Sequence, residues 1–234
     1  MSRLVLATDQ AMVYDDFLPA EDFAPLFGYA ESVPYVFTHD EMWHKAWSLT
    51  DGLPLFGKGT FFRDDGAYTS DELQHYPTRT ALDPLLAAIR GAANDAEAII
   101  GKSGVHWSSF VVNPFLHPRG TGLSLHRDGI IYTGAVVFYV HREWNVHWGG
   151  HLLILDSRTG AGVDVDDPQL YSFLSDENEN RVVTEPGIAL CILPKPNRLV
   201  ILNGNAYHMI TRVDDNAGDR PRITLSGFFI KPGA

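Results

Sequence analysis

The triplet His126-Arg127-Asp128 places a histidine and an aspartate two positions apart, directly after the alternating residues Leu123-Ser-Leu125. In an extended strand, side chains two apart point to the same face, so the imidazole and the carboxylate would project together. With one more histidine from a distant strand, they would form the 2-His-1-carboxylate set that binds non-haem Fe(II). Short triplets recur by chance, so this interpretation depends on the residues that come after Asp128.

An ordered series of strand-like and loop-like blocks occupies the chain after Asp128. An apolar run is succeeded by a Trp-containing segment, a Gly-Gly turn and a second apolar run, which predicts two strands joined by a loop. Further along come another apolar strand, a distal histidine and a final strand that begins with arginine. These blocks are Thr133–Val140, His141–Trp148, Gly149-Gly150, Leu152–Leu155, Leu199–Leu202, His208 and Arg222–Phe229.

This order resembles the Fe(II)- and 2-oxoglutarate-dependent dioxygenases of the prolyl-hydroxylase type. Their pattern is His-x-Asp, a Tyr-Leu-Asn-x-x-Trp-like block, Gly-Gly-x-Leu, an Arg-Leu-Val strand, the distal His and an Arg before the last strand. The resemblance extends from Asn113 to Phe229. It implies that Fe(II) is bound by His126, Asp128 and His208, with 2-oxoglutarate as co-substrate and ascorbate as a stimulant.

The far carboxylate of 2-oxoglutarate needs a cation, and arginine can bind a carboxylate with two parallel hydrogen bonds. Arg220 and Arg222 are both candidates. Arg222 with Thr224 resembles the family's Arg-x-Ser/Thr pair, and alternation would place Arg222, Thr224, Ser226 and Phe228 on one face of a strand. Arg222 is therefore favoured, and Arg220 is expected to be an exposed loop residue. Tyr139 matches the family's tyrosine, a further donor to this carboxylate, although it could also be a core residue.

The sequence departs from the family pattern at several positions. His151 stands where the family usually has an acidic residue, and Phe115 and Leu116 stand where it often has a tyrosine. His141, His147 and His151 could form a rival metal cluster, but Gly149-Gly150 would break a helix between them, so they are interpreted as loop histidines near a pocket rim. Two further runs, His39–His44 and Asp164–Asp167, are interpreted as surface histidines and a solvated loop.

The resemblance implies hydroxylation of an unactivated C–H bond with release of succinate and CO2. A single compact domain favours a small, amino-acid-derived substrate. A peptidyl or prolyl hydroxylase acting on a protein or peptide is the alternative, and a non-catalytic β-helix that senses a ligand or metal is a third hypothesis. A halogenase would replace the carboxylate by a small residue, and Asp128 argues against that. Desaturation or ring closure stays open, as does the oligomeric state.

The whole chain sets the limits for these hypotheses. Its 234 residues, 45% hydrophobic and 20% charged, suit one globular domain. The net charge of -11 argues against nucleic acid as a partner. No apolar run reaches the ~20 residues that span a bilayer. The single cysteine, Cys191, lies in an apolar run and is interpreted as a core residue, and a chain without disulfides favours the cytoplasm.

The predicted fold is mainly β, a double-stranded β-helix (jelly roll) with N-terminal supporting helices. The predicted division of the single domain (1–234) is a helical support over about 1–105 and a β-helix core over about 106–234. Apolar residues three or four apart predict an amphipathic helix over Thr80–Ile100, with Gly101 as a plausible C-cap.

Overall fold

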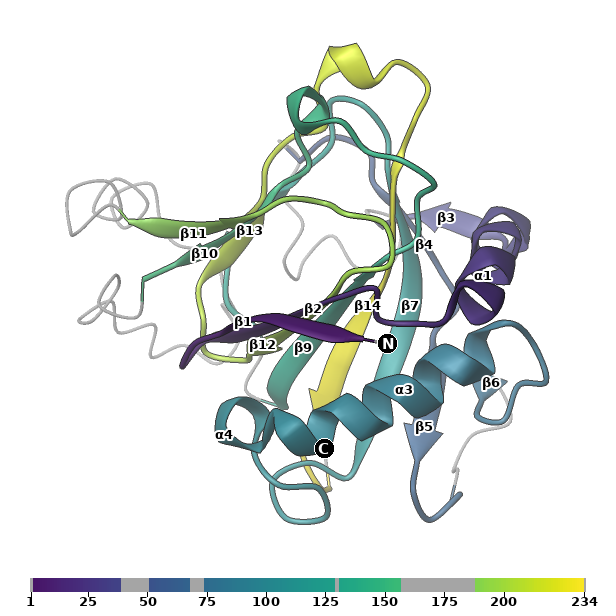
Figure 1. The fold of residues 1–234 in the computed structure, drawn as a ribbon, viewed down its shortest axis with the longest axis vertical. Coiled ribbons are helices and arrows are strands. Elements are labelled where there is room, and N and C mark those ends of the chain that lie inside the picture. The colour runs from purple at the N-terminus through teal and green to yellow at the C-terminus, as the bar shows by residue number, and fades with distance from the viewer. Residues whose placement is uncertain (1, 39–50, 68–73, 129–130, 157–187, 234) are drawn as a thin grey trace.

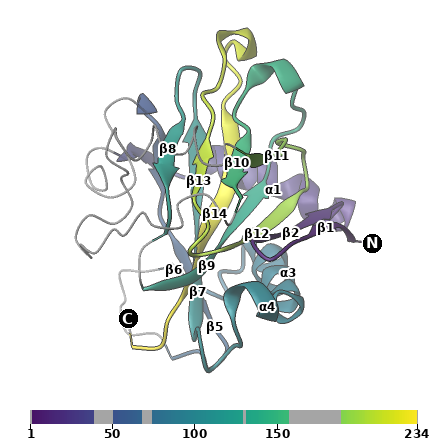
Figure 2. The ribbon, with the colours of Figure 1, turned by 90° about the vertical axis from the view of Figure 1, so that its left-hand side faces the viewer.

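Two mainly antiparallel sheets face each other in the computed structural model, which describes residues 2–38, 51–67, 74–128, 131–156 and 188–233. Figure 1 shows the larger sheet together with the helices, and Figure 2 shows the smaller sheet from the side. The prediction of a mainly β jelly roll is therefore confirmed. The strand order in the larger sheet is β1 (Arg3–Ala7), β2 (Ala11–Asp15), β12 (Leu199–Asn203), β9 (Tyr132–Tyr139), β14 (Arg222–Ile230), β7 (Ser109–His117), β4 (Leu55–Gly57) and β3 (Tyr35–Phe37). Two more strands belong to this sheet: β5 (Thr60–Arg63), which pairs with β7, and β6 (Gln74–His75), which pairs with β5. The strand order in the smaller sheet is β11 (Ala189–Ile192), β10 (Leu152–Leu155), β13 (His208–Ile210) and β8 (Leu123–His126).

Alternation along the central strands separates two apolar layers. On β9, Val136 and Phe138 pack with the helices, whereas Val137 and Tyr139 pack with residues of the smaller sheet. The period of two in a strand makes the central strands β9 and β12 face both layers in this way. The layer between the sheets contains Ala11, Val13, Ala135, Leu152, Ile154, Ile192, Val200, Leu202 and Ala206 in addition. Side chains of odd number on β9 thus face the interior between the sheets.

Helices cover the outer face of the larger sheet (Figure 1). They are α1 (Ala20–Ser32), α3 (Leu82–Asp95) and the single turn α4 (Glu97–Ile100). In α3 the apolar residues Leu82, Leu85, Leu86 and Ile89 are buried against the sheet, as the amphipathic pattern predicts. Gly101 ends α4 with φ +80°, a backbone conformation that glycine adopts without steric cost. None of the helices in the described ranges is long and apolar enough to cross a membrane.

The N-terminal segment contributes strands as well as helices. β2 pairs with β12, and β4 and β5 both pair with β7, so residues before 106 extend the larger sheet on both sides. In the sequence-based prediction this segment is only a helical support, because the partner of each of these strands lies far away in sequence. Short strands such as β3 and β4 carry little periodicity of their own.

The prediction that Cys191 is a core residue is wrong, because its side chain is exposed. β11 is the edge strand of the smaller sheet. Its alternation turns Leu190 and Ile192 toward the layer between the sheets and Cys191 away from it. An unbroken apolar run does not reveal which of its residues face inward.

Candidate metal and co-substrate site

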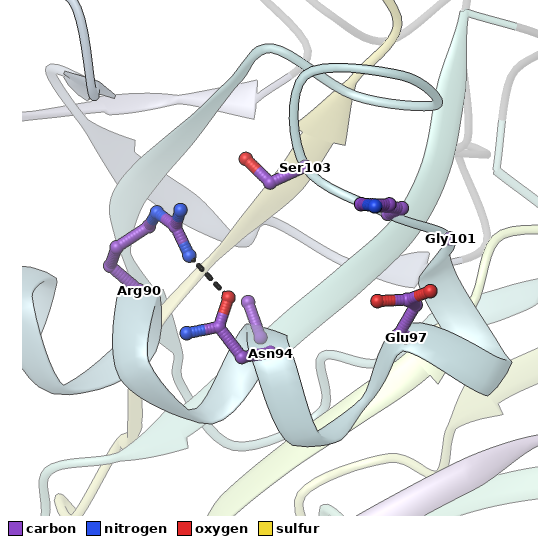
Figure 3. Close-up of a pocket in the computed structure, with 7 residues that line it drawn as sticks. Arg90, Asn94, Glu97, Gly101 and Ser103 are labelled. Carbon is purple, nitrogen blue, oxygen red and sulfur yellow. Dashed lines mark hydrogen bonds between the residues drawn. The ribbon is translucent and has the colours of Figure 1, made fainter.

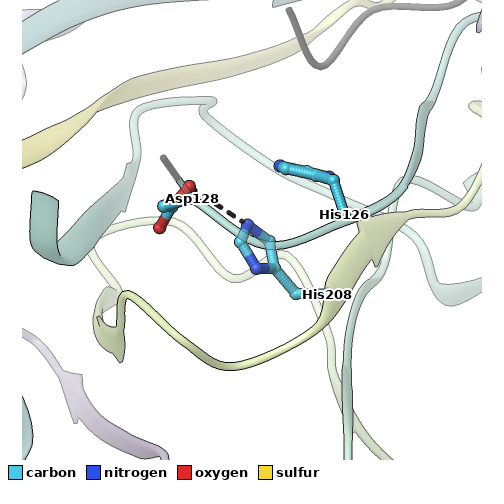
Figure 4. A group of neighbouring side chains, drawn as sticks. All are labelled: His126, Asp128 and His208. Atoms are coloured by element: carbon cyan, nitrogen blue, oxygen red, sulfur yellow. Dashed lines mark ion pairs between the residues drawn. The ribbon is translucent and has the colours of Figure 1, made fainter. Parts of the chain in front are cut away.

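Three side chains meet inside the jelly roll, between the two sheets. Ligand atoms of His126, Asp128 and His208 all lie within 4.8 Å of one another, and Figure 4 shows the three side chains pointing toward a common centre. His126 ends β8 and His208 begins β13, and the two residues are direct partners in the β8–β13 ladder. Among the residues that the structure describes, this is the one group with the composition of a metal site.

Backbone carbonyls fix the orientation of both imidazoles. His126 Nδ1 lies 2.7 Å from Ser124 O, and His208 Nδ1 lies 2.9 Å from Ala206 O. A carbonyl oxygen can only accept a hydrogen bond, so each Nδ1 carries the proton and each Nε2 presents its lone pair. This arrangement is typical of histidines that bind a metal through Nε2.

Burial controls the charges of these ligands. Burial lowers the pKa of His126 to about 3, and the nearby His208 adds to this shift, whereas the hydrogen bond to Ser124 O opposes it. His126 is therefore neutral at pH 7. Burial also raises the pKa of Asp128 to about 6, although His208 opposes that shift. Asp128 Oδ1 lies 4.0 Å from His208 Nε2, and Oδ2 is buried without a hydrogen-bond partner in the described ranges. Two imidazoles that present Nε2 and one carboxylate are a suitable donor set for a divalent metal.

Asp128 lies beyond the strand that the His-x-Asp triplet predicted. β8 ends at His126, so strand alternation does not by itself place the carboxylate. The two residues nevertheless converge, because the chain after His126 keeps Asp128 beside His208 of the neighbouring strand.

A second buried group of polar side chains surrounds Arg222 on the larger sheet. Arg222 is fully buried, and its Nε donates to Gly150 O at 2.9 Å. Both Nη atoms lack a hydrogen-bond partner in the part of the chain that the structure describes, as do Tyr139 Oη and Thr224 Oγ1. Tyr139 and Thr224 are partners in the β9–β14 ladder, and the Arg222 guanidinium carbon lies 5.0 Å from the centre of the Tyr139 ring.

These unpaired donors indicate an anion site. A buried cation without a partner is costly, and two parallel N–H groups of one guanidinium match a carboxylate. The residues present therefore fit the far carboxylate of 2-oxoglutarate, while the His-Asp-His group fits the metal. Arg220, by contrast, has a largely exposed side chain that lies 3.5 Å from Glu143 Oε1 and over the Trp148 ring.

Gly149-Gly150 holds Arg222 in place. Gly150 has φ +65°, and an added Cβ would lie 2.9 Å from Arg222 Cδ. Gly149 has φ +66°, and a Cβ there would overlap the carbonyl oxygen of Arg212. Only glycine accommodates both the backbone conformation and the close contacts, which accounts for the Gly-Gly pair of the sequence.

The three histidines of the rival cluster do not converge. His147 is exposed, and His151 is half-buried with Nε2 3.1 Å from Val146 O. His141 is not a rim residue as expected, since it is buried and its ring stacks on Trp144 at 4.7 Å. The sequence contained one indication of this burial: His141 lies two positions after Tyr139, so strand alternation would turn both side chains to the interior face. His39–His44 and Asp164–Asp167 lie outside the described residues.

A shallow pocket on the surface lies apart from this site, at the end of α3 and around α4 (Figure 3). Arg90 is its most prominent cation, and it is already bonded to Asp64 and Asn94. Its other charged residues, Glu97 and Lys102, are exposed, so the pocket has no buried charge comparable to Arg222.

Comparisons with known proteins agree on the fold. No protein-family model matches the sequence, and no curated protein matches it either. Solved structures do match. A prolyl-4-hydroxylase of Pseudomonas putida is 19% identical, covering 95% of this chain and 93% of that one, with a TM-score of 0.58. HygX of Streptomyces hygroscopicus, solved with nickel, 2-oxoglutarate and hygromycin B, is 10% identical, covering 95% and 83%, with a TM-score of 0.57.

A third similar structure contains a peptide. It is a prolyl hydroxylase of Trichoplax adhaerens in complex with a fragment of the hypoxia inducible factor oxygen degradation domain. It is 12% identical, covering 96% of this chain and 84% of that one, with a TM-score of 0.56. The chain thus shares the jelly roll of this group of oxygenases, whose members differ widely in what they are crystallised with.

Proposed function

We propose that the protein is an Fe(II)- and 2-oxoglutarate-dependent oxygenase that hydroxylates an unactivated C–H bond of a small molecule. One observation carries the proposal: a His-Asp-His group and a fully buried arginine with two Nη atoms that lack a partner in the described ranges lie in the interior of one jelly roll. Either feature alone would fit several classes of protein. Together they match a co-substrate that chelates a metal at one end and carries a carboxylate at the other.

In this proposal His126, Asp128 and His208 bind Fe(II), while Arg222, Thr224 and Tyr139 bind the far carboxylate of 2-oxoglutarate. The bound iron and co-substrate would supply the oxidising chemistry, with decarboxylation of 2-oxoglutarate to succinate. The chain's own residues supply geometry: Ser124 O and Ala206 O hold the imidazoles, and Gly150 O holds the guanidinium. The apolar layer between the sheets would exclude water from the reacting atoms.

The test is succinate formation by protein loaded with Fe(II) under anaerobic conditions and then exposed to oxygen. Amino acids, other metabolites and proline-containing peptides form the substrate panel, and the product is identified by mass. Turnover with a small molecule supports the proposal, and turnover with peptides alone would favour a peptidyl hydroxylase. If the protein does not bind 2-oxoglutarate at all, the remaining hypothesis is a non-catalytic β-helix that senses a ligand or metal.

The same assay separates hydroxylation from halogenation. In this proposal Asp128 would be a metal ligand where a halogenase has a small residue, so added chloride should not enter the product. A chlorinated product from the wild-type protein would contradict the hydroxylase assignment.

A further inference from the structure

His141 is a buried polar residue to which the proposed function assigns no role. It is 3% exposed, and neither ring nitrogen has a hydrogen-bond partner in the ranges that the structure describes. Leaving a buried donor or acceptor unsatisfied costs free energy, so such a ring needs a partner. In the family block that this sequence resembles, asparagine stands at the position where this chain has the imidazole of His141.

The position of His141 connects it to the Arg222 group. Its ring centre lies 5.6 Å from that of Tyr139 and 4.7 Å from that of Trp144, with the latter pair stacked. Trp144 is held by a hydrogen bond from Nε1 to Gly149 O, next to the Gly150 carbonyl that accepts from Arg222 Nε. His141, Trp144, Gly150 and Arg222 are therefore parts of one packed unit.

The charge state of His141 makes it a donor. Burial, aided by the positive charge of Arg222, lowers the pKa of His141 to about 3. At neutral pH the ring is therefore uncharged and carries one N–H. A carboxylate is a group that accepts hydrogen bonds from a guanidinium, an imidazole N–H and hydroxyl groups together. His141 thus joins Arg222, Tyr139 and Thr224 as a fourth side chain with unused donor capacity.

We propose that His141 binds the co-substrate, donating an imidazole N–H to the same far carboxylate of 2-oxoglutarate that Arg222 binds. The inference rests on the proposed function. It adds a contact that does not depend on metal chelation, and so it should raise the preference for a diacid over the corresponding monoacid.

The test compares two probes in two variants. 2-Oxopentanoate has the carbon chain of 2-oxoglutarate but lacks the far carboxylate. His141→Phe keeps an aromatic ring that can stack on Trp144 but has no donor, whereas His141→Gln loses the ring and keeps an N–H. Calorimetry with anaerobic Fe(II)-loaded protein gives the Kd of each probe, and His147→Phe at an exposed position is the matched control.

The expected result is a rise in the Kd of 2-oxoglutarate of about 10- to 100-fold in His141→Phe, the value of one hydrogen bond to a charged group. His141→Gln should restore most of that affinity, and the Kd of 2-oxopentanoate should stay unchanged in both. The opposite pattern, with Phe tolerated and Gln not, would assign His141 a stacking role and overturn the inference. Equal weakening of both probes would overturn it as well.

Failure of the proposed function gives a different result. If wild-type protein did not bind 2-oxoglutarate, both proposals would be wrong. If the wild type bound it and His141→Phe bound it equally well, only the inference about His141 would be wrong.

Discussion

A single buried charge dominates the proposed co-substrate site. Removing Arg222 would leave a buried carboxylate without its cation, which typically costs about 3–5 kcal/mol. At about 1.4 kcal/mol per tenfold change, Arg222→Ala should raise the Kd of 2-oxoglutarate by about two to three orders of magnitude. Arg220→Ala should change it by only a few fold, because the side chain of Arg220 is 59% exposed. A 2-oxoglutarate titration measures both, and the reverse order would move the carboxylate site to Arg220.

The distal histidine offers the corresponding test of the metal site. His208→Ala removes one of three ligands and should abolish both turnover and stoichiometric iron binding, because three donors on one face are needed to hold the metal. Iron content per chain, succinate formation and the melting temperature should be measured together. His106→Ala provides a histidine control on the exposed loop after α4. A folded His208→Ala protein with ordinary iron content and turnover would disprove the assignment.

At the scale of secondary structure elements, the Gly-Gly turn before β10 positions Arg222. Gly150→Ala imposes φ +65° on a residue with a Cβ, costing about 1–2 kcal/mol of unfolding free energy. The added Cβ also pushes against Arg222 Cδ and so displaces the guanidinium that would bind the carboxylate; a misplacement of about 1 Å can slow turnover by ~100-fold. We expect the Kd of 2-oxoglutarate to rise while metal binding is retained.

Gly91→Ala is the matched control for that substitution. Gly91 lies in α3, and an added Cβ would meet nothing within 4 Å. The unfolding free energy should therefore rise by about 0.5–1 kcal/mol, with the Kd of 2-oxoglutarate unchanged. Equal Kd values for Gly150→Ala and the wild type would show that the turn does not position Arg222.

Helices and strands were predictable where the hydrophobic periodicity extends over many residues. The burial of single residues was less predictable, because it depends on contacts between distant segments. The strand over β9, the helix over α3 and the strand of Arg222 follow from periodicity and are found in the structure. The exposure of Cys191 and the burial of His141 were missed. Both depend on which elements lie across from a strand or loop, and this information is not contained in local periodicity. The convergence of His126 with His208 was predictable only through the family resemblance.

At the scale of the whole molecule, Asp15 links the N-terminal strands to the rest of the larger sheet. It is 4% exposed and accepts hydrogen bonds from Arg198 Nε at 2.7 Å and Lys195 Nζ at 2.8 Å. Burial alone would raise the pKa of Asp15, but the hydrogen bonds and charges of Arg198 and Lys195 outweigh it, and the pKa lies below its ordinary value. This carboxylate therefore stabilises the folded state when ionised.

The sign of the resulting pH dependence follows from that lowered pKa. The contribution is fully present above the unfolded pKa of about 3.9 and is lost as the pH falls through the lower folded value. Asp15→Asn should cost about 1–3 kcal/mol of unfolding free energy at pH 7, with the difference from wild type shrinking below about pH 4. Denaturant unfolding across this range measures it. The control is Asp64→Asn, in a more exposed pair with Arg90, which should cost only about 0–1 kcal/mol of unfolding free energy. If the cost of Asp15→Asn did not change with pH, the ionised Asp15 carboxylate would not be the source of the stabilisation.

The two halves of the proposed site belong to different sheets. His126 and His208 lie on the smaller sheet, whereas Tyr139, Arg222 and Thr224 lie on the larger one. A co-substrate of fixed length that reaches from the metal to the arginine would bind well only when the two sheets are at the matching distance from each other. Enlarging a residue of the layer that separates them, such as Val137, whose ladder partners are Val200 and Ser226, would change that spacing without replacing any of the proposed ligands. Iron affinity and the fold could then survive while turnover is lost, so that catalysis reports on the packing of the whole jelly roll.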